Sequence, residues 1–256
     1  MKRRIAVVYG GYSGEAVVSE KSAQMVLANI DKDKFEVTAV EITKSKWIAH
    51  IDGAKLPINK HDFSVSTPDG KRSFDKVFNI IHGTPGEDGI LQGYFQMVGM
   101  PHTSSEVFAM SLTFNKSANN TYLKQFGFNC AKSVVLRKTD HYSVSKIVDK
   151  LGLPCFVKPN EGGSSIGISK VKEASQMVAA IELAFDENSE VIIEEFISGR
   201  EVSCGVITKQ GRAFAMPLTE MIPFGEFFDY KAKYEGNSNE ITPADIPKKL
   251  TLQIQN

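Results

Sequence analysis

The chain has 256 residues, enough for one large domain or two to three small ones with a sizeable hydrophobic core. Its 30 Lys and Arg residues balance 30 Asp and Glu residues, so no net charge recruits nucleic acid or an anionic membrane, and any anion site must be local. No apolar segment approaches the ~18 residues of a membrane span. The basic N-terminus resembles the start of a secretory signal, but the apolar run Ile5–Tyr9 is too short for one.

Cysteine and histidine spacing indicates neither a disulfide framework nor a zinc site. Cys130, Cys155 and Cys204 are odd in number, widely spaced and without a CxxC pair. This pattern favours reduced, buried thiols and a cytoplasmic location. The five histidines are scattered, without HxH or HExxH spacing, so no zinc site is proposed.

The first part of the chain alternates strands and helices, which predicts an open α/β domain over residues 1–104. A glycine-rich turn separates the first strand from the first helix. Val18, Met25 and Val26 form the expected apolar stripe of that helix. Strands are predicted at 4–9, 35–42 and 76–81, helices at 15–30 and 91–98, and a short extended piece at 101–103.

The pattern then changes and predicts a separate α+β domain over residues 105–194. One long helix is expected from Ser105 to Gly127, a residue type common just after helix C-termini. Its apolar positions are Val107, Met110, Phe114, Tyr122, Leu123 and Phe126. Strands are predicted at 132–136, 155–158, 166–171 and 191–195, and helices at 144–151 and 174–185.

Residues 195–256 indicate the beginning of a third domain with an antiparallel sheet. Two strands, 201–208 and 213–218, flank a turn at Gln210-Gly211. The segment 224–239 is polar, rich in glycine and aromatic residues and poorly periodic, which predicts a long functional loop. A helix at 248–255 is expected to follow.

The strand that ends in Lys158 leads into a loop with the features of a phosphate site. Gly162 and Gly163 let backbone N–H groups approach an anion without hindrance from a Cβ. Ser164 and Ser165 add hydroxyl donors, and the lysine adds a compact positive charge. Paired glycines also commonly just turn a hairpin, so the loop alone favours phosphate binding only modestly.

The turn Gly10-Gly-Tyr-Ser-Gly-Glu15 lies between a strand and a helix, where free N–H groups hold anions. Glu36 follows about 20 residues on, as in a dinucleotide site, although the adjacent glycines do not match GxGxxG. Glu15 places a carboxylate where a pyrophosphate would rest, which suits a substrate ammonium instead. A simple interaction of Glu15 with the helix dipole, worth ~0.5 kcal/mol, explains the motif equally well.

Polar residues also follow a buried strand at His82-Gly-Thr-Pro-Gly-Glu-Asp-Gly89. Ligands bind at the carboxyl ends of strands in open sheets, so this turn is a candidate functional loop. Glycine and proline also make it partly an ordinary turn. The four polar groups at this edge favour the functional interpretation.

Two further segments suit a nucleotide. The backbone of Glu194–Ile197 can pair with an adenine edge while Phe196 and Ile197 cover the ring, and Glu201 is placed to accept ribose hydroxyls. An edge strand with solvated acids explains this segment better when it is taken alone. Phe227–Tyr234 combines four aromatic residues with two lysines in an irregular segment, as lids over phosphates do.

Taken in this order, the segments resemble the D-alanine–D-alanine ligases of the ATP-grasp superfamily. The match spans nearly the whole chain, and the joint order is highly specific although each piece alone is weak. The matching pieces are 10–15, 82–89, Lys116 in Phe-Asn-Lys, 158–167, 194–199 and 229–234. The resemblance implies an N-terminal open α/β domain, a central α+β lid domain and an incomplete C-terminal antiparallel-sheet domain.

The resemblance also implies a role for individual residues. Those expected to bind ATP are Lys116, Lys158, Ser164, Ser165, Glu194, Glu195, Phe196, Ile197, Glu201 and Lys233. Glu15 and His82 are expected to bind the first D-alanine. Ser164 and Tyr234 are expected to close a hydrogen-bonded clamp with Glu15, which makes these three the catalytic set. Tyr234 also favours an amine acceptor over D-lactate.

The implied reaction has two steps. The carboxylate of one D-alanine attacks the γ-phosphate of ATP, and the amine of a second D-alanine then displaces phosphate from the acyl phosphate. The product serves peptidoglycan precursor synthesis. Positioning and charge neutralisation supply most of the catalysis. Ligases of this family are typically dimers, so a homodimer is expected.

The family pattern continues past Asn256 into a segment that carries the magnesium ligands. Mg²⁺ is therefore an expected cofactor without a named ligand, and the chain as given is expected to have little or no ligase activity. Three alternatives stay open: another ATP-grasp ligase with a different partner for Glu15, a nucleotide-binding module without catalysis, and an NAD-dependent enzyme that uses Glu36. The last leaves the Lys158 loop without a role.

Overall fold

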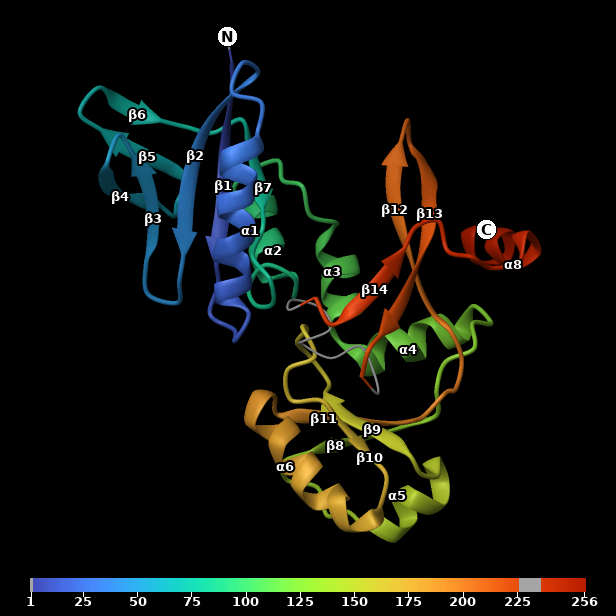
Figure 1. Ribbon diagram of the computed structural model, residues 1–256. Coiled ribbons are helices and arrows are strands. Elements are labelled where there is room, and N and C mark those ends of the chain that lie inside the picture. The colour runs from blue at the N-terminus through green and yellow to red at the C-terminus, as the bar shows by residue number, and fades with distance from the viewer. Residues whose placement is uncertain (1, 226–235) are drawn as a thin grey trace.

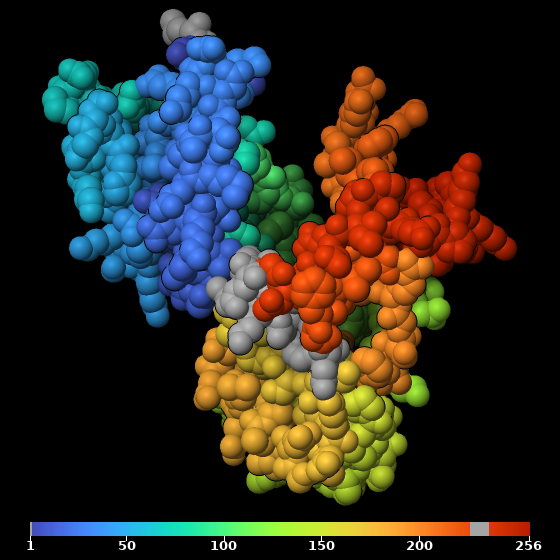
Figure 2. Space-filling view, viewed as in Figure 1, coloured from blue at the N-terminus to red at the C-terminus, as the bar shows by residue number. Residues whose placement is uncertain are grey.

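The computed structural model describes residues 2–225 and 236–256. Three lobes follow one another along the chain: an α/β lobe, a central α+β lobe, and a small antiparallel sheet (Figures 1 and 2). Helices α3 (Val107–Phe114) and α4 (Lys116–Gln125) lie where the lobes meet. The predicted fold class, with an open α/β part, an α+β part and an antiparallel C-terminal sheet, is confirmed.

Seven strands form the N-terminal sheet in the order β6-β5-β4-β3-β2-β1-β7. β1 (Arg3–Gly10) pairs in parallel with β2 (Phe35–Ile42) and β7 (Lys76–Asn79), as a β-α-β opening requires. An isolated bridge between Val77 and His102 adds the predicted extended piece. The antiparallel strands are β3 (Trp47–Ile51), β4 (Ala54–Asn59), β5 (Ser64–Thr67) and β6 (Gly70–Arg72).

Strand β1 is buried because its alternate side chains pack against different layers. Val7 packs with Ala23 of α1 (Ala16–Asn29), and Val8 belongs to the cluster that contains Phe95 of α2 (Ile90–Met97). The turns after β1 and β7 therefore lie at the carboxyl edge of a rigid, doubly covered sheet. That edge is where the sequence places Glu15 and His82.

Helix α1 is rotated relative to the predicted stripe. Val18 is buried as expected, but Met25 is 68% exposed. Ser19 causes the difference, because its buried hydroxyl accepts a hydrogen bond from Gly10 N at 2.9 Å and donates one to Ile80 O at 2.8 Å. These bonds turn Ser19 and Ala23 toward the sheet and leave Met25 at the margin.

The single long helix predicted over 105–127 is wrong. Asn115 has an extended backbone, with φ −90° and ψ 106°, and ends α3. Its side chain accepts a hydrogen bond from Ala118 N and so caps α4. Phe114 and Tyr122, on either side of the junction, lie eight residues apart, a spacing that still fits one helix face and so hides the break.

The central sheet has the order β10-β9-β11-β8, and every neighbouring pair is antiparallel. Its strands are β8 (Ser133–Arg137), β9 (Cys155–Pro159), β10 (Ser169–Val171) and β11 (Glu190–Glu195). α5 (Val144–Leu151), the 3₁₀ turn η1 (Ala174–Gln176) and α6 (Met177–Glu187) cover one face (Figure 1). β10 begins later than the predicted 166–171, because Ile166 and Gly167 still belong to the loop.

The C-terminal sheet has the order β12-β13-β14 and projects from the centre of the molecule (Figure 1). β12 (Glu201–Lys209) and β13 (Arg212–Pro223) join at the predicted Gln210-Gly211 turn, where both φ angles are positive, +52° and +75°. β14 (Ser238–Ile241) takes up the end of the predicted 224–239 loop, and α8 (Lys248–Gln255) matches its prediction. Within the described ranges, every helix is too short or too polar to span a bilayer.

Candidate active site

Glu15 is a buried carboxylate at the carboxyl end of β1. It precedes α1 and is 4% exposed. Ser164 Oγ, from the loop between β9 and β10, donates a hydrogen bond to Glu15 Oε1. Among the residues that the structure describes, no Lys, Arg or His forms an ion pair with Glu15. Because buried charges require a compensating partner, this carboxylate suits a cationic ligand.

Two glycines from different lobes close on the same carboxylate. A Cβ placed on Gly83 would lie 2.7 Å from Glu15 Oε2, and one on Gly163 would lie 2.9 Å from Oε1. Either atom would overlap the carboxylate. Gly83 also has φ +68°, a conformation that favours glycine. The site therefore requires glycine at both positions.

The loop that carries Ser164 has an unusual backbone. Ser164 and Ser165 both lie in the left-handed region, with φ +51° and +59°. Consecutive non-glycine residues in this region are uncommon and persist when their surroundings hold them. The bond to Glu15 supplies one such restraint across the two lobes.

His82 lies beside this site, and both its backbone and its ring contact neighbouring residues. Its carbonyl accepts a hydrogen bond from Ser13 Oγ at 3.1 Å, and its Nε2 lies 3.4 Å from Ser22 Oγ. The next N–H, of Gly83, donates to Glu87 Oε2 at 2.7 Å. Burial raises the pKa of Glu87, the Gly83 N–H lowers it, and the negative charge of Glu15 raises it further.

A cavity of about 470 Å³ opens between the two lobes beside Glu15. The N-terminal lobe contributes Tyr12 and Ser13 to its wall, and the Lys158 loop contributes Gly162 and Gly163. Its lining joins the two glycine-rich turns that the sequence singled out. The space is of the size that a small polar ligand and part of a nucleotide require.

Lys116 approaches the same loop from the start of α4. Its Nζ donates to the carbonyl oxygen of Gly162 at 2.8 Å, and its backbone N–H donates to Asn160 O at 2.9 Å. Burial, and then the neighbouring charge of Lys158, lower the pKa of Lys116 to about 8. Two close ammonium groups in a partly buried site favour a polyanionic ligand.

Lys158 and Glu194 form an ion pair between β9 and β11. Glu194 is 8% exposed, and its other oxygen accepts a hydrogen bond from Asn120 Nδ2 at 2.7 Å. The buried charge of Glu194 is thus balanced by a cation and an amide. Among the predicted nucleotide residues, this pair and Lys116 lie together.

Four other predicted nucleotide residues lie further out, along the chain that leads to β12: Glu195, Phe196, Ile197 and Glu201. Glu195 turns away toward β8, where its side chain accepts from Lys132 N at 2.8 Å and pairs with Lys132 Nζ at 3.7 Å. The Phe196 ring lies 6.1 Å from that of Phe156, with Lys170 Nζ 4.3 Å from its centroid. Ile197 and Glu201 are exposed. Lys233 and Tyr234 lie outside the described residues.

Asn160 is the main site residue that sequence reasoning missed. It is fully buried at the end of β9 and donates to Asn115 Oδ1 at 3.1 Å and to Glu190 Oε2 at 2.9 Å. Its own Oδ1 accepts from Ser117 N at 2.9 Å. An asparagine directly after an apolar strand was the available signal, although its partners lie more than 25 residues away in the sequence.

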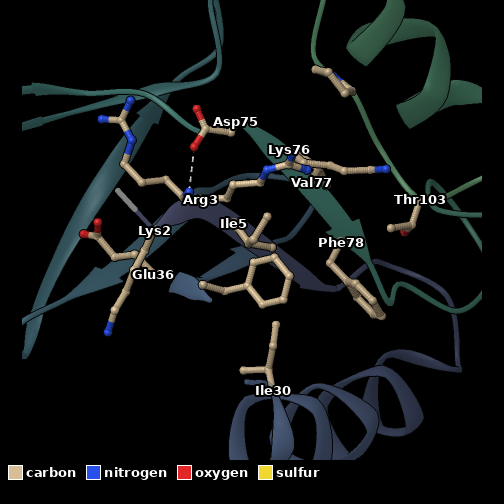
Figure 3. A pocket seen from close by; sticks show the side chains of 13 residues that line it. Lys2, Arg3, Ile5, Ile30, Glu36, Asp75, Lys76, Val77, Phe78 and Thr103 are labelled. Atoms are coloured by element: carbon tan, nitrogen blue, oxygen red, sulfur yellow. Dashed lines mark hydrogen bonds between the residues drawn. The ribbon is translucent and has the colours of Figure 1, made fainter. Parts of the chain in front are cut away.

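A larger cavity, of about 1510 Å³, lies at the opposite edge of the N-terminal sheet. Figure 3 shows Ile5, Ile30 and Phe78 gathered between the sheet and the end of α1. Asp75 closes one side by accepting a hydrogen bond from Arg4 N at 2.7 Å. Open parallel sheets bind ligands at the carboxyl ends of their strands, so this amino-edge cavity is not the candidate site.

The lobes and their contacts define a class of protein. Two lobes whose glycine-rich loops meet near half-buried lysines, together with a third antiparallel sheet, form an ATP-grasp fold. Among the described residues, no group of three or more His, Cys, Asp or Glu side chains is placed to hold a metal ion.

Comparison with known proteins identifies the family. The family model described as "D-ala D-ala ligase N-terminus" matches residues 4–105, and the one described as "D-ala D-ala ligase C-terminus" matches 122–256. The chain belongs to the D-alanine–D-alanine ligase family, and it is a ligase. The sequence prediction of this family is confirmed.

Individual relatives agree with this assignment. The D-alanine–D-alanine ligase of Phocaeicola vulgatus is 47% identical over 256 residues, covering 100% of this chain and 79% of the relative. The ligase of Flavobacterium johnsoniae is also 47% identical, covering 98% of this chain and 78% of the relative. The VanG D-Ala:D-Ser ligase of Enterococcus faecalis matches with a TM-score of 0.83 and 32% identity, covering 100% of this chain and 80% of that structure.

Proposed function

We propose that the protein joins two D-alanines at the expense of ATP, through an acyl phosphate. One observation carries the proposal: Glu15 is a buried carboxylate without a cationic partner among the described residues, and Ser164 of the proposed phosphate loop donates a hydrogen bond to it. An ammonium group would compensate the charge of Glu15. The same loop would then bring the ATP phosphates close to the amino acid that this ammonium belongs to.

The first step needs ATP and one D-alanine in contact. Lys116 and Lys158 neutralise phosphate oxygens, with Ser164 and Ser165 as hydroxyl donors, while Glu15 and His82 hold the amino acid. The D-alanine carboxylate oxygen attacks the γ-phosphorus. The bond to the bridging oxygen breaks, ADP leaves, and an acyl phosphate forms.

The second step forms the peptide bond. The neutral amine of the second D-alanine attacks the acyl carbon, and the tetrahedral intermediate expels inorganic phosphate and gives up the amine proton. The acyl phosphate hydrolyses in water, so the loop over the cavity protects it. Two residues with proposed roles lie outside the described residues: Tyr234, proposed for the clamp, and Lys233, proposed to contact phosphate.

We propose further that the adenosine lies along the chain from Glu194 to Glu201. Lys170 and Phe156 already order the Phe196 ring, which gives the base an aromatic neighbour. In the structure Glu195 pairs with Lys132, so its proposed contribution is through its backbone. Ile197 and Glu201 are exposed and accessible to a ligand.

Magnesium is the cofactor expected for this chemistry, since it would neutralise the β- and γ-phosphates. The described residues do not offer a matching set of ligands. The proposal therefore assigns no metal ligand and derives no step through the ion.

The deciding experiment measures ligand binding by calorimetry and phosphate release from ATP with D-alanine, L-alanine and D-serine. D-Serine is included because a structural relative is a D-Ala:D-Ser ligase. Binding and release that depend on D-alanine and not on L-alanine support the proposal. Preference for another amino acid would favour a different ATP-grasp carboxylate–amine ligase.

The expectation that the 256-residue chain itself releases little phosphate stays a prediction, and release at a normal ligase rate would contradict it.

Glu15→Gln tests the amine site directly. We expect D-alanine affinity to fall by about 10- to 100-fold, since an ionic hydrogen bond is lost, while ATP affinity stays nearly unchanged. Glu20→Gln on the exposed face of α1 is the matched control and should leave both affinities unchanged. A fall in ATP affinity with D-alanine affinity preserved would show that Glu15 serves the nucleotide.

The finer biological setting is also proposed. The product would serve peptidoglycan precursor synthesis in the cytoplasm, and the protein would act as a homodimer. Size-exclusion chromatography coupled to light scattering distinguishes a 28.2 kDa monomer from a dimer of twice that mass.

A further inference from the structure

Asn120 contacts the proposed nucleotide site from α4, at a position that the sequence did not implicate. It lies in the second turn of α4, and its Nδ2 donates to Glu194 Oε1 at 2.7 Å across 74 residues of chain. Glu194 Oε2 pairs with Lys158. The Glu194 carboxylate is therefore held at one oxygen by a neutral amide and at the other by a cation.

An ionised carboxylate held in this way presents only acceptors to a ligand. Its two oxygens offer about four lone-pair positions, and the described contacts use two of them. Glu194 stands at the end of β11, directly before the residues proposed to hold the base. An acceptor at that place matches a base with an exocyclic amino group and repels one with a keto oxygen.

Asn120 decides which way this acceptor points. Glu194 has a flexible side chain, and in the absence of the amide the Lys158 ammonium would attract both of its oxygens. The amide competes for one oxygen and so fixes the plane of the carboxylate. Because hydrogen bonds weaken steeply with misalignment, fixing this plane sets how well the carboxylate accepts from a base.

The contact is not required to dock α4 on the central sheet. The beginning of the helix is already tied to β9 by Lys116 N to Asn160 O at 2.9 Å and by Ser117 N to Asn160 Oδ1 at 2.9 Å. A further anchor, Asn115 Nδ2 to Glu161 Oε1, measures 2.9 Å. Asn120 adds a bond to one specific carboxylate.

We propose that Asn120 is a positioning residue for base selection: by orienting the Glu194 carboxylate as a fixed acceptor, it makes the site prefer a 6-aminopurine nucleotide to a 6-oxopurine nucleotide. This inference rests on the proposed ATP site. It adds to that site a residue and a physical reason for its preference.

ATP and ITP test the inference, because their bases differ in the 6-amino or 6-oxo group, and in the proton that the 6-oxopurine carries on N1, while the ribose and triphosphate are the same. Both bind with the same triphosphate, so the ratio of their dissociation constants cancels any effect on the phosphate contacts. In the wild-type chain, calorimetry should give tighter binding of ATP. Asn120→Ala should reduce the ITP-to-ATP ratio of dissociation constants by about five- to tenfold, the size expected for one misaligned hydrogen bond.

Asn119→Ala is the matched control, because it changes the same residue type in the same turn of α4. The described hydrogen bonds include its backbone N–H but not its side chain. It should leave the ratio unchanged. Asn120→Asp keeps the shape of the side chain but removes the donor, so it should also reduce the ratio and serves if the alanine variant fails to fold. Glu194→Gln can present a donor to the keto oxygen and should reduce the ratio as well.

The possible failures are distinguishable. Equal losses of ATP and ITP affinity in the Asn120 variants, with the ratio intact, would reduce Asn120 to a structural contact and overturn the inference. A wild-type chain that binds both nucleotides equally would overturn it while leaving the proposed ATP site in place. A wild-type chain that binds neither would overturn the proposed function itself.

Discussion

The two sides of the site are built differently. On the side proposed to bind the amino acid, the backbones of Gly83 and Gly163 close on Glu15, and neither leaves room for a methyl group. On the side proposed to bind the nucleotide, Lys116 and Lys158 are held by a carbonyl and a carboxylate. The first side is therefore sensitive to volume, and the second to charge and protonation.

Gly83→Ala should have the largest effect, because it would disrupt the proposed binding site for the amino acid. The added Cβ would collide with Ser13 Oγ and with Glu15, and the φ of +68° strains any side chain. We expect D-alanine affinity to fall by about 100-fold, as displacements near 1 Å do in oriented sites. Calorimetric titration with D-alanine measures the change.

Gly93→Ala in α2 is its control, since no atom lies within 4 Å of the added Cβ. It should leave D-alanine affinity unchanged and stabilise the helix by up to ~1 kcal/mol. Wild-type affinity in Gly83→Ala would mean that the Glu15 carboxylate moves freely, and the contrast between the two sides would be lost.

Ser164→Ala should have an intermediate effect and sharpens the comparison, because this residue joins the two sides. The substitution removes the hydrogen bond to the buried Glu15 carboxylate. We expect about a tenfold loss of D-alanine affinity, the usual size for a hydrogen bond to a charged group. Ser175→Ala in η1, where the hydroxyl contacts only the side chain of Glu173 among the described hydrogen bonds, should change nothing. An unchanged D-alanine affinity in Ser164→Ala would show that the loop does not contribute to the proposed amino-acid site.

The smallest expected effect is a dependence of ATP affinity on pH, which arises from the Lys116 ammonium. With its pKa lowered to about 8, the ammonium loses its proton as pH rises from 7 to 9. ATP affinity should fall a few-fold over that range, since one charge contact is lost. Lys116→Arg stays charged and should flatten the profile, while Lys124→Arg on the exposed face of α4 should not.

The same group affects stability with a definite sign. Between about pH 8 and the ordinary lysine pKa, the folded chain binds fewer protons than the unfolded chain at Lys116. The free energy of unfolding should therefore rise with pH over that window relative to Lys116→Met. Urea unfolding at several pH values measures the difference. A falling or flat difference would contradict the lowered pKa.

The sequence predicted elements with strong periodicity and missed those without it. β2, α5 and α8 match their predicted ranges because an apolar run or helical stripe marks each of them. The antiparallel strands β3 to β6 were not predicted, because they have three to six residues and polar outer faces. They are stabilised by an aromatic cluster that includes Trp47, Phe63 and Tyr94, which assembles only in the fold.

The site shows the same limit. Local spacing singled out the glycine-rich turns, since each is a continuous segment. The proximity of Glu15 and Ser164, 149 residues apart, came from the family resemblance and not from spacing. Asn120 carries no local signal and Asn160 only its position directly after an apolar strand, because their partners approach them only after folding.

Asn160 has a consequence for the order in which ligands bind. It fastens the beginning of α4 to the end of β9, so we expect Lys116, Lys158 and the glycine–serine loop to move as one body. The bond between Ser164 and Glu15, by contrast, joins that body to another. If the lobes separated, the proposed phosphate contacts would stay together, while the proposed amino-acid pocket would come apart. We therefore expect the nucleotide to bind first and the amino acid to bind last.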